Sequence, residues 1–199
     1  SKNQQKQYVM TMKLRNVPFS PPDMTEAEAD EVREAILSGW ITTGPRTKKL
    51  EKEVAEFVGA DKAVCLNSQT ACAEMALRLL GIGKGDEVIV PAYTYTASAS
   101  IVEHVGATLV FVDVQKDCLE MDYEAVEAAI TERTKAIIPV DLAGIPCDYD
   151  RLKAIVEAKK SLFRPVTDLQ QQIGRVAICC DAAHAFGAER KGVKVGAIA

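Results

Sequence analysis

The sequence predicts an α/β protein of three layers, in which a mostly parallel β-sheet lies between two layers of helices. Three observations support this prediction. Short apolar runs alternate along the chain with segments of helical periodicity, as in folds built from β-α-β units. Several of these runs are continuously apolar, which is typical of strands covered on both faces. The 199 residues are 48% hydrophobic and 26% charged, enough to bury the core of one domain.

Two helices are expected before the first strand. Thr25 and Glu28 form a capping-box pattern, which begins a helix that we expect to run to Ser38 and to stop at Gly39. A second helix is expected over 46–58, where apolar residues recur at the spacing of one helical face. Residues 1–24, before the first helix, are expected to form an N-terminal arm.

Five strands and four more helices are expected over the rest of the chain. We expect strands at 63–66, 87–90, 109–112, 136–140 and 176–180, and helices at 70–80, 96–104, 122–130 and 148–159. Residues 160–175 form a longer connection, expected to contain a short helix and to lie at the amino end of the last strand. The stretch ERKGVKVG is typical of a polar hairpin turn, so neither Lys191 nor Lys194 is expected to be catalytic.

Composition narrows the class of protein. The net charge is −4 with acids and bases interspersed, which argues against a nucleic-acid partner. No apolar run approaches the roughly 20 residues that a bilayer requires, and the polar start lacks the apolar core of a signal peptide. The six cysteines form no metal-binding pattern and are expected to be reduced thiols in the core. The sequence therefore predicts a cytoplasmic protein without a membrane partner or a metal.

Ligands of open parallel sheets collect at the carboxyl ends of the strands, so the residues that follow each strand are candidates for a site. Ser68, Thr70 and Ala71 follow the first apolar run and open a helix. Their amides and hydroxyls suit a phosphate, although an ordinary serine N-cap would have the same sequence. The sequence contains neither of two glycine-rich phosphate-binding motifs, G-x-x-x-x-G-K-S/T and G-x-G-x-x-G.

Three other strand-end residues complete the candidate site. Tyr95 lies in a turn before a helix, where its ring either stacks on a flat ligand or packs beneath that helix. Asp181 ends an apolar run, and its carboxylate needs a partner, either a ring nitrogen, a helix N-terminus or a distant cation. His184 follows it and is either a ligand contact or a core histidine. An anion, a flat ring and a protonated ring nitrogen together describe pyridoxal 5'-phosphate.

The order of these motifs resembles the sugar aminotransferases of the DegT/DnrJ/EryC1/StrS family, which are fold-type-I pyridoxal phosphate enzymes. The matching stretches run from about Pro18 to the last residue, and they are SGWITTGPRTKKLEKEVAEFVGA, NSQTACAEMAL, GDEVIVPAYTYTASASIVEHVGATLVFVDV, TKAIIPVDLAG and DAAHAFGA.

The resemblance implies a role for each candidate residue. Thr70 and Ala71, beside Ser68, match the positions that hold the cofactor phosphate. Tyr95 matches the aromatic residue that stacks on the pyridine ring, Asp181 the acid that pairs with the ring nitrogen, and His184 a position beside the 3-hydroxyl. Thr43 and Gly44 match a loop that lines the sugar pocket.

The resemblance also implies that 25–199 is an incomplete large domain. The lysine that forms the Schiff base is expected beyond residue 199, together with later strands and a small domain, so this chain is expected to hold no catalytic residue. Because 63–66 pairs in this fold with strands from beyond residue 199, we expect residues 1–199 alone not to fold stably and to be inactive.

The predicted activity is transfer of an amino group from an amino acid, with glutamate as the expected donor, to a keto sugar linked to a nucleotide. A homodimer is implied by the family. Three alternatives remain open, namely a sugar dehydratase of the same family that uses the same cofactor, another fold-type-I enzyme such as a lyase or desulfurase, and a regulator without catalysis.

Overall fold

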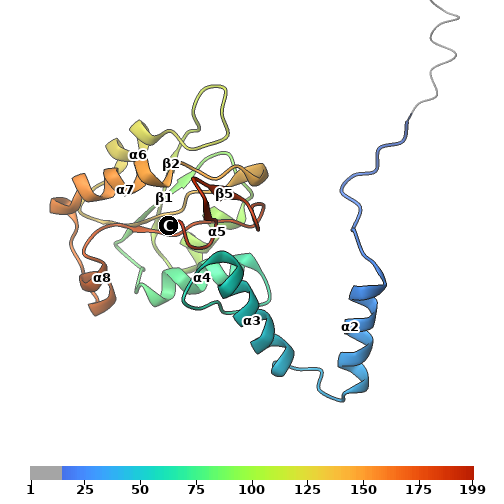
Figure 1. Ribbon diagram of the computed structural model, residues 1–199. Coiled ribbons are helices and arrows are strands. Elements are labelled where there is room, and N and C mark those ends of the chain that lie inside the picture. Colours follow the sequence, from blue (N-terminus) through green and yellow to red (C-terminus); the bar gives the residue numbers. More distant parts are fainter. Residues whose placement is uncertain (1–14) are drawn as a thin grey trace, which may run out of the picture. The chain divides into compact units, whose positions relative to one another are not determined.

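The computed structural model describes residues 15–199 (Figure 1). Contacts within the chain divide it into two units, Ser1–Gly44 and Pro45–Ala199. Residues 1–14 of the predicted N-terminal arm lie outside the described residues. The domain start predicted at residue 25 falls within the first unit and stays a prediction.

The first unit contains helix α2 (Glu26–Leu37), as predicted. The Thr25 hydroxyl accepts from the Ala27 amide, and the Glu28 carboxylate accepts from the Thr25 amide at 2.6 Å, which forms the capping box. The hydrogen bonds from the side chain and then the backbone of Thr25 lower the pKa of Glu28. Gly39 follows the helix with a φ of 74°, a left-handed conformation that glycine adopts without strain.

The second unit is built on a four-stranded sheet in the order β2-β1-β3-β4, with every described pair parallel. Its strands are β1 (Glu87–Pro91), β2 (Thr108–Val112), β3 (Thr134–Ile137) and β4 (Ala177–Ile178). A parallel bridge between Val140 and Asp181 continues the pairing beyond β3 and β4. The parallel sheet predicted from the apolar runs is therefore confirmed.

Helices cover both faces of this sheet (Figure 1). The helices of this unit are α3 (Pro45–Val58), α4 (Gln69–Leu79), α5 (Ala97–His104), α6 (Tyr123–Ala129), α7 (Tyr149–Ala158) and α8 (Asp168–Ile173). Of these, α4 and α5 pack on one face of the sheet, and α6 and α7 pack on the other. Alternation along β1 separates two apolar clusters: Val88 and Val90 pack with α4 and α5, whereas Ile89 packs with α6 and α7. The three-layer architecture follows from this alternation.

The first predicted strand is the main error in the predicted elements. Residues 63–66 form no strand, and Val64 and Leu66 are 71% and 43% exposed. No strand within residues 15–199 pairs with this segment, and the Cys65 amide donates instead to the Glu51 carboxylate at 2.9 Å. Apolar composition favours a strand, but a strand forms only where a neighbour accepts its backbone hydrogen bonds.

The long connection at 160–175 contains a 3-10 turn (Lys160–Leu162) and helix α8. The segment packs beside the end of α4, where buried Gln170 donates to the Leu80 carbonyl at 2.8 Å. Lys135, in β3, donates to the Arg164 carbonyl at 2.5 Å. These contacts lie at the amino ends of the strands, as predicted.

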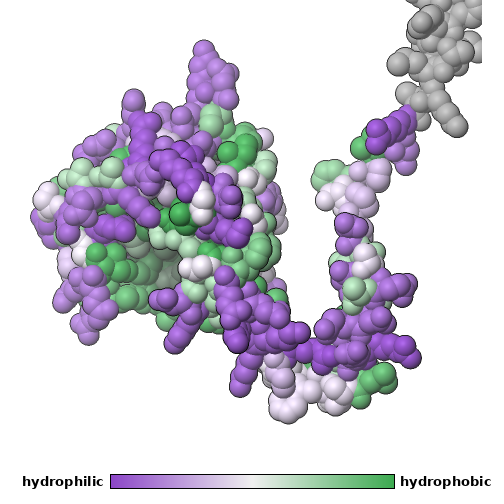
Figure 2. Space-filling model, viewed as in Figure 1, coloured by the Kyte–Doolittle hydropathy of each residue, from purple (hydrophilic) through white to green (hydrophobic). Residues whose placement is uncertain are grey.

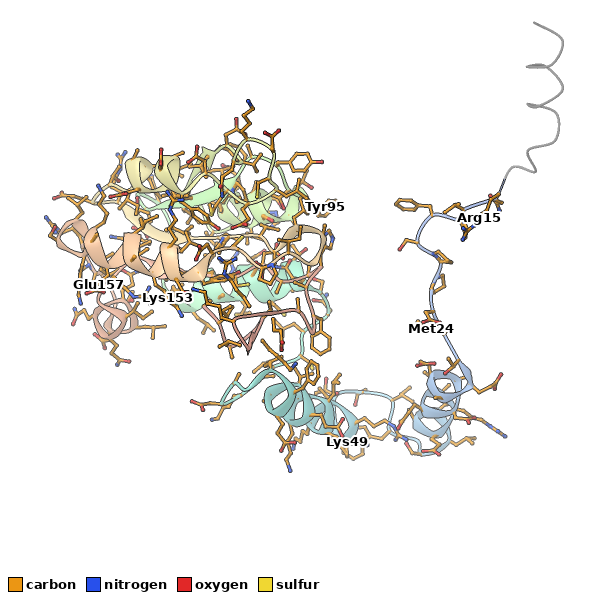
Figure 3. The ribbon with its side chains drawn as sticks, turned by 45° about the horizontal axis from the view of Figure 1, so that its top comes forward. Arg15, Met24, Lys49, Tyr95, Lys153 and Glu157 are labelled. Carbon is orange, nitrogen blue, oxygen red and sulfur yellow. The ribbon has the colours of Figure 1, made fainter. Side chains whose placement is uncertain are left out.

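The predicted hairpin is also present, as the antiparallel pair β5 (Glu189–Arg190) and β6 (Val193–Lys194). Lys191 and Gly192 form its turn with φ values of 51° and 79°, which is the pattern of a two-residue hairpin turn. Lys191 pairs with Asp150 of α7 at 2.5 Å. Lys153 and Glu157 lie one turn apart on the same helix (Figure 3).

The cysteines are only partly as predicted. All six are free, but only Cys147 is buried, and Cys72 is exposed. Cys72, Cys179 and Cys180 line a cavity of about 570 Å³ between α4 and the end of β4. Figure 2 shows an apolar hollow on the face of this unit in view. The prediction that these thiols fill a core is therefore wrong for Cys72.

Candidate functional site

The strand ends converge on a cavity of about 180 Å³ at the carboxyl edge of the sheet. Its walls come from the start of α4, the loop after β1, the start of α5 and the segments that follow β3 and β4. The residues that line it include Gln69, Thr70, Thr94, Tyr95, Ser98, Asp181 and His184. Four of the six residues predicted to contact the cofactor therefore lie around one space.

Asp181 is the acid of this cavity and is only 6% exposed. Its amide donates to the Pro139 carbonyl at 2.8 Å, which fixes the backbone at the end of the sheet. Its Oδ1 accepts from the Ala183 amide at 3.2 Å, and its Oδ2 accepts from the Ser98 hydroxyl at 3.0 Å. A carboxylate has about four acceptor positions, so capacity remains for a ligand that donates a proton.

Ser68 is the N-cap of α4, and its hydroxyl accepts from the Ala71 amide at 3.1 Å. The first intrahelical bond runs from Cys72 to the Ser68 carbonyl, so the amides of Gln69, Thr70 and Ala71 have no partner within the helix. Of these three amides, only that of Ala71 donates to the Ser68 hydroxyl. Thr70 lines the cavity, whereas Ser68 and Ala71 do not. The helix therefore presents the Gln69 and Thr70 amides and the Thr70 hydroxyl for an anion.

Tyr95 is 75% exposed and lines the cavity from the loop between β1 and α5. Figure 3 shows it at the outer edge of the second unit. The alternative that its ring packs beneath its own helix is therefore wrong. Tyr93, two residues earlier, is 60% exposed but does not line the cavity.

His184 is exposed and lines the cavity beside a short loop, 141–147. The Ala143 amide donates to its Nδ1 at 3.4 Å. Because Nδ1 accepts, the neutral ring carries its proton on Nε2 and donates only from that atom. Ala143 has a φ of 56°, in the left-handed region of backbone conformation. His184 is therefore a cavity residue, and the alternative of a core histidine is wrong.

Asp141 anchors this loop from below and is completely buried. Its Oδ1 accepts from the Cys147 amide at 2.8 Å and from the Tyr149 hydroxyl at 2.9 Å, and its Oδ2 accepts from the Cys180 thiol at 3.2 Å. Burial, and then the nearby Asp141 carboxylate, raise the pKa of both the Cys147 and Cys180 thiols well above their ordinary value. These groups therefore stay protonated and hold the loop that carries Ala143.

Two residues that hold the cavity's side chains and loop in place, Asp141 and Ser98, were not among the predicted site residues. Asp141 follows an apolar strand just as Asp181 does, and that placement was the available signal. Ser98 lies within an amphipathic helix, where a single hydroxyl gives no sequence signal of its partner 83 residues away.

The predicted sugar-loop residues Thr43 and Gly44 belong to the first unit. There the Trp40 indole donates to the Thr43 carbonyl at 3.2 Å. A Cβ atom on Gly44 would lie 2.1 Å from the Trp40 Nε1, so the indole packs where only glycine fits. Their predicted contact with a sugar stays a prediction.

No group of three or more His, Cys, Asp or Glu side chains among residues 15–199 is placed to hold a metal ion. In the same part of the chain, none of the helices combines the length and apolar character that crossing a membrane requires.

The three layers and the acid, aromatic ring and helix start around the cavity define the class of fold-type-I pyridoxal phosphate enzymes. Comparison with protein-family models narrows this class. Residues 22–199 match the DegT/DnrJ/EryC1/StrS aminotransferase family, and the chain belongs to that family.

Solved structures agree with this assignment. Spr1654 from Streptococcus pneumoniae, assigned as a sugar aminotransferase, is 56% identical with a TM-score of 0.91, and the match covers 93% of this chain and 46% of that one. Its structure is known in apo, PMP and PLP forms. An aminotransferase from Psychrobacter cryohalolentis is 38% identical with a TM-score of 0.77, covering 90% of this chain and 42% of the other.

A GDP-4-keto-6-deoxymannose-3-dehydratase shares the fold with a TM-score of 0.78 at 24% identity, and the match covers 91% of this chain and 45% of the dehydratase. At that identity the likeness concerns the fold alone. The chain spans about half the length of each of these three proteins.

Proposed function

We propose that the full-length protein carrying this chain is a pyridoxal 5'-phosphate-dependent aminotransferase. It transfers an amino group from an amino acid, with glutamate as the expected donor, to the keto group of a nucleotide-linked sugar. The observation that carries this proposal is the buried Asp181 carboxylate facing the same cavity as the first turn of α4. Family membership and the relatives described above support the reaction type.

The donor set of the cavity fits the cofactor. The Thr70 amide and hydroxyl would hold the phosphate at the start of α4, with the Ser68 cap and the Ala71 amide fixing that turn. The exposed ring of Tyr95 would stack on the pyridine ring. The spare acceptor capacity of Asp181 suits a protonated ring nitrogen, and the Nε2–H of His184 suits the 3-oxygen of the ring.

When bound, pyridoxal phosphate supplies an electron-accepting ring for the carbon that exchanges its nitrogen. Asp181 would hold a proton at the ring nitrogen and balance the resulting positive charge. Tyr95 would fix the plane of the ring and exclude water from one face. His184, held by the Ala143 amide, would keep its donor directed at one oxygen atom.

The remaining machinery is proposed to lie outside residues 1–199. A lysine in the rest of the protein would act as nucleophile and move protons during the transfer. Lys191 and Lys194 are not assigned this role, because Lys191 pairs with Asp150 of α7 and Lys194 pairs with Glu189 across the hairpin. Thr43 and Gly44 are proposed to line the sugar pocket, and the protein is proposed to act as a homodimer.

The test uses the full-length protein incubated with pyridoxal phosphate and freed of excess by gel filtration. We expect the protein to retain the cofactor with an altered visible spectrum, which borohydride reduction fixes covalently to a lysine. With glutamate and a nucleotide-linked keto sugar, 2-oxoglutarate and an amino sugar should form in equal amounts.

Matched variants and outcomes sharpen this test. Replacing both Lys191 and Lys194 by alanine should leave retention of the cofactor unchanged. Failure of the wild-type protein to bind the cofactor would refute the proposal. Loss of water from the sugar without incorporation of nitrogen would instead assign the dehydratase reaction.

A further inference from the structure

Three side chains form a hydrogen-bonded row that ends on the acid of the cavity. The Thr94 Oγ1 lies 3.3 Å from the Ser98 Oγ, and the Ser98 Oγ lies 3.0 Å from the Asp181 Oδ2. Ser98 is 2% exposed and Asp181 is 6% exposed, so water competes little for the contact between them, whereas Thr94 is only partly buried. The row therefore runs from the partly buried edge of the site into its buried wall.

An ionised Asp181 sets the direction of donation along this row. An ionised carboxylate only accepts, so the single proton of Ser98 must point to the Asp181 Oδ2. The Ser98 oxygen is then left as an acceptor, and Thr94 must donate to it. The row reads Thr94 to Ser98 to Asp181, and every donor in it supports a negative charge on the acid.

The row also connects two parts of the site that lie far apart in the sequence. Thr94 lies in the loop that carries Tyr95, whereas Ser98 lies in the first turn of α5. Asp181 follows β4, 83 residues after Ser98. The loop with the exposed aromatic ring is thus tied through one hydroxyl to the acid.

We propose that Ser98, with Thr94 as its donor, is a positioning residue that keeps the Asp181 carboxylate ionised and directed at the ring nitrogen of the cofactor. This inference rests on the proposed function and deepens it. A hydrogen bond donated to a carboxylate favours its charged form. Without it, the proton shared between Asp181 and the ring nitrogen shifts toward the acid, and the ring loses positive charge.

The test reads the ring nitrogen directly. The full-length protein is loaded with cofactor that is ¹⁵N-labelled at the ring nitrogen, and the ¹⁵N chemical shift reports whether that nitrogen is protonated. In Ser98→Ala we expect the signal to move toward that of the neutral ring, and turnover to fall about tenfold, the effect of one lost hydrogen bond to a charged group. Ser98→Thr keeps the hydroxyl and should restore both values.

Two more variants test the upstream donor and provide a control. Thr94→Ala removes only the upstream donor, so it should move the signal in the same direction by a smaller amount. Ser100→Ala removes a hydroxyl of the same helix that donates to the Ala97 carbonyl at 3.3 Å, and should leave the signal unchanged.

The outcomes separate this inference from the proposed function. A wild-type protein that binds no cofactor would refute both. If the wild type binds it with a protonated ring nitrogen, but Ser98→Ala and Thr94→Ala give the wild-type signal, the positioning role is refuted and the proposed function stands. A lower melting temperature with an unchanged signal would likewise assign Ser98 a merely structural role.

Discussion

Replacing Asp181 by asparagine removes one negative charge from the cavity while keeping the shape of the side chain. Asp181 accepts from two donors, the Ala183 amide and the Ser98 hydroxyl. Asparagine has one oxygen and one NH₂ group. The Ala183 amide can only donate, so the oxygen must face it, and the NH₂ group then faces the Ser98 oxygen.

Ser98 can adapt to this change, because its hydroxyl can rotate to donate to Thr94, 3.3 Å away, and accept from the asparagine. Both donors keep a partner, so we expect Asp181→Asn to cost about 1 kcal/mol of unfolding free energy or less. The main effect of losing the charge is instead a weaker interaction with the ring nitrogen of the cofactor. Cofactor affinity should fall about tenfold, since a charge-assisted hydrogen bond becomes a neutral one.

Turnover should fall much further, by about 10²- to 10³-fold, as for removal of one preorganised electrostatic partner. The assay is amino transfer by the full-length protein at saturating cofactor, with melting temperature and cofactor affinity measured in parallel. Asp113→Asn is the matched control, because Asp113 follows strand β2, at the opposite edge of the sheet from β4, and is exposed. Full turnover in Asp181→Asn would refute the role assigned to the charge.

Three further predictions concern the surroundings of the cavity. Asp141→Ala should lower the unfolding free energy by about 2–6 kcal/mol in denaturant titrations, because the Cys147 amide and the Tyr149 hydroxyl lose their acceptor, together with the weaker Cys180 thiol donor. Asp141→Asn keeps the oxygen that faces the first two donors and should cost only about 1 kcal/mol. His184→Gln offers one acceptor and one donor in place of Nδ1 and Nε2–H, so its turnover should stay within about threefold of the wild-type value. His184→Leu offers neither, so its turnover should fall about tenfold. Burial raises the pKa of Cys179 to about 11, so the rate of its alkylation should rise about tenfold per pH unit below that value. Mass spectra should show that exposed Cys72 is alkylated before Cys179, and equal labelling of the two thiols at neutral pH would contradict this order.

The elements with a complete local signal could be predicted from the sequence. The capping box at Thr25 and the hairpin turn at Gly192 involve residues close in sequence, and both formed as expected. Strand β1 is apolar from Val88 to Pro91 and buried throughout, as continuous apolar character predicts. The segment 63–66 has a similar composition but no strand neighbour among residues 15–199, so its local signal was insufficient.

The candidate site, like the fold, could be predicted from the sequence only in part. Residues directly after each strand could be predicted, because parallel strands bring their carboxyl ends to one edge, and this placed Thr70, Tyr95, Asp181 and His184 around a single cavity. The fold class, the family and these four positions follow from the sequence alone.

Only the tertiary structure decided how those side chains are held. Packing of α5 on the sheet brings the Ser98 hydroxyl to Asp181, and the anchored loop above Asp141 brings the Ala143 amide to His184. Each contact joins residues more than 40 positions apart or depends on a backbone conformation that the residue type does not favour. Periodicity and composition record which face of an element is buried, whereas hydrogen-bond partners depend on the three-dimensional distances between elements.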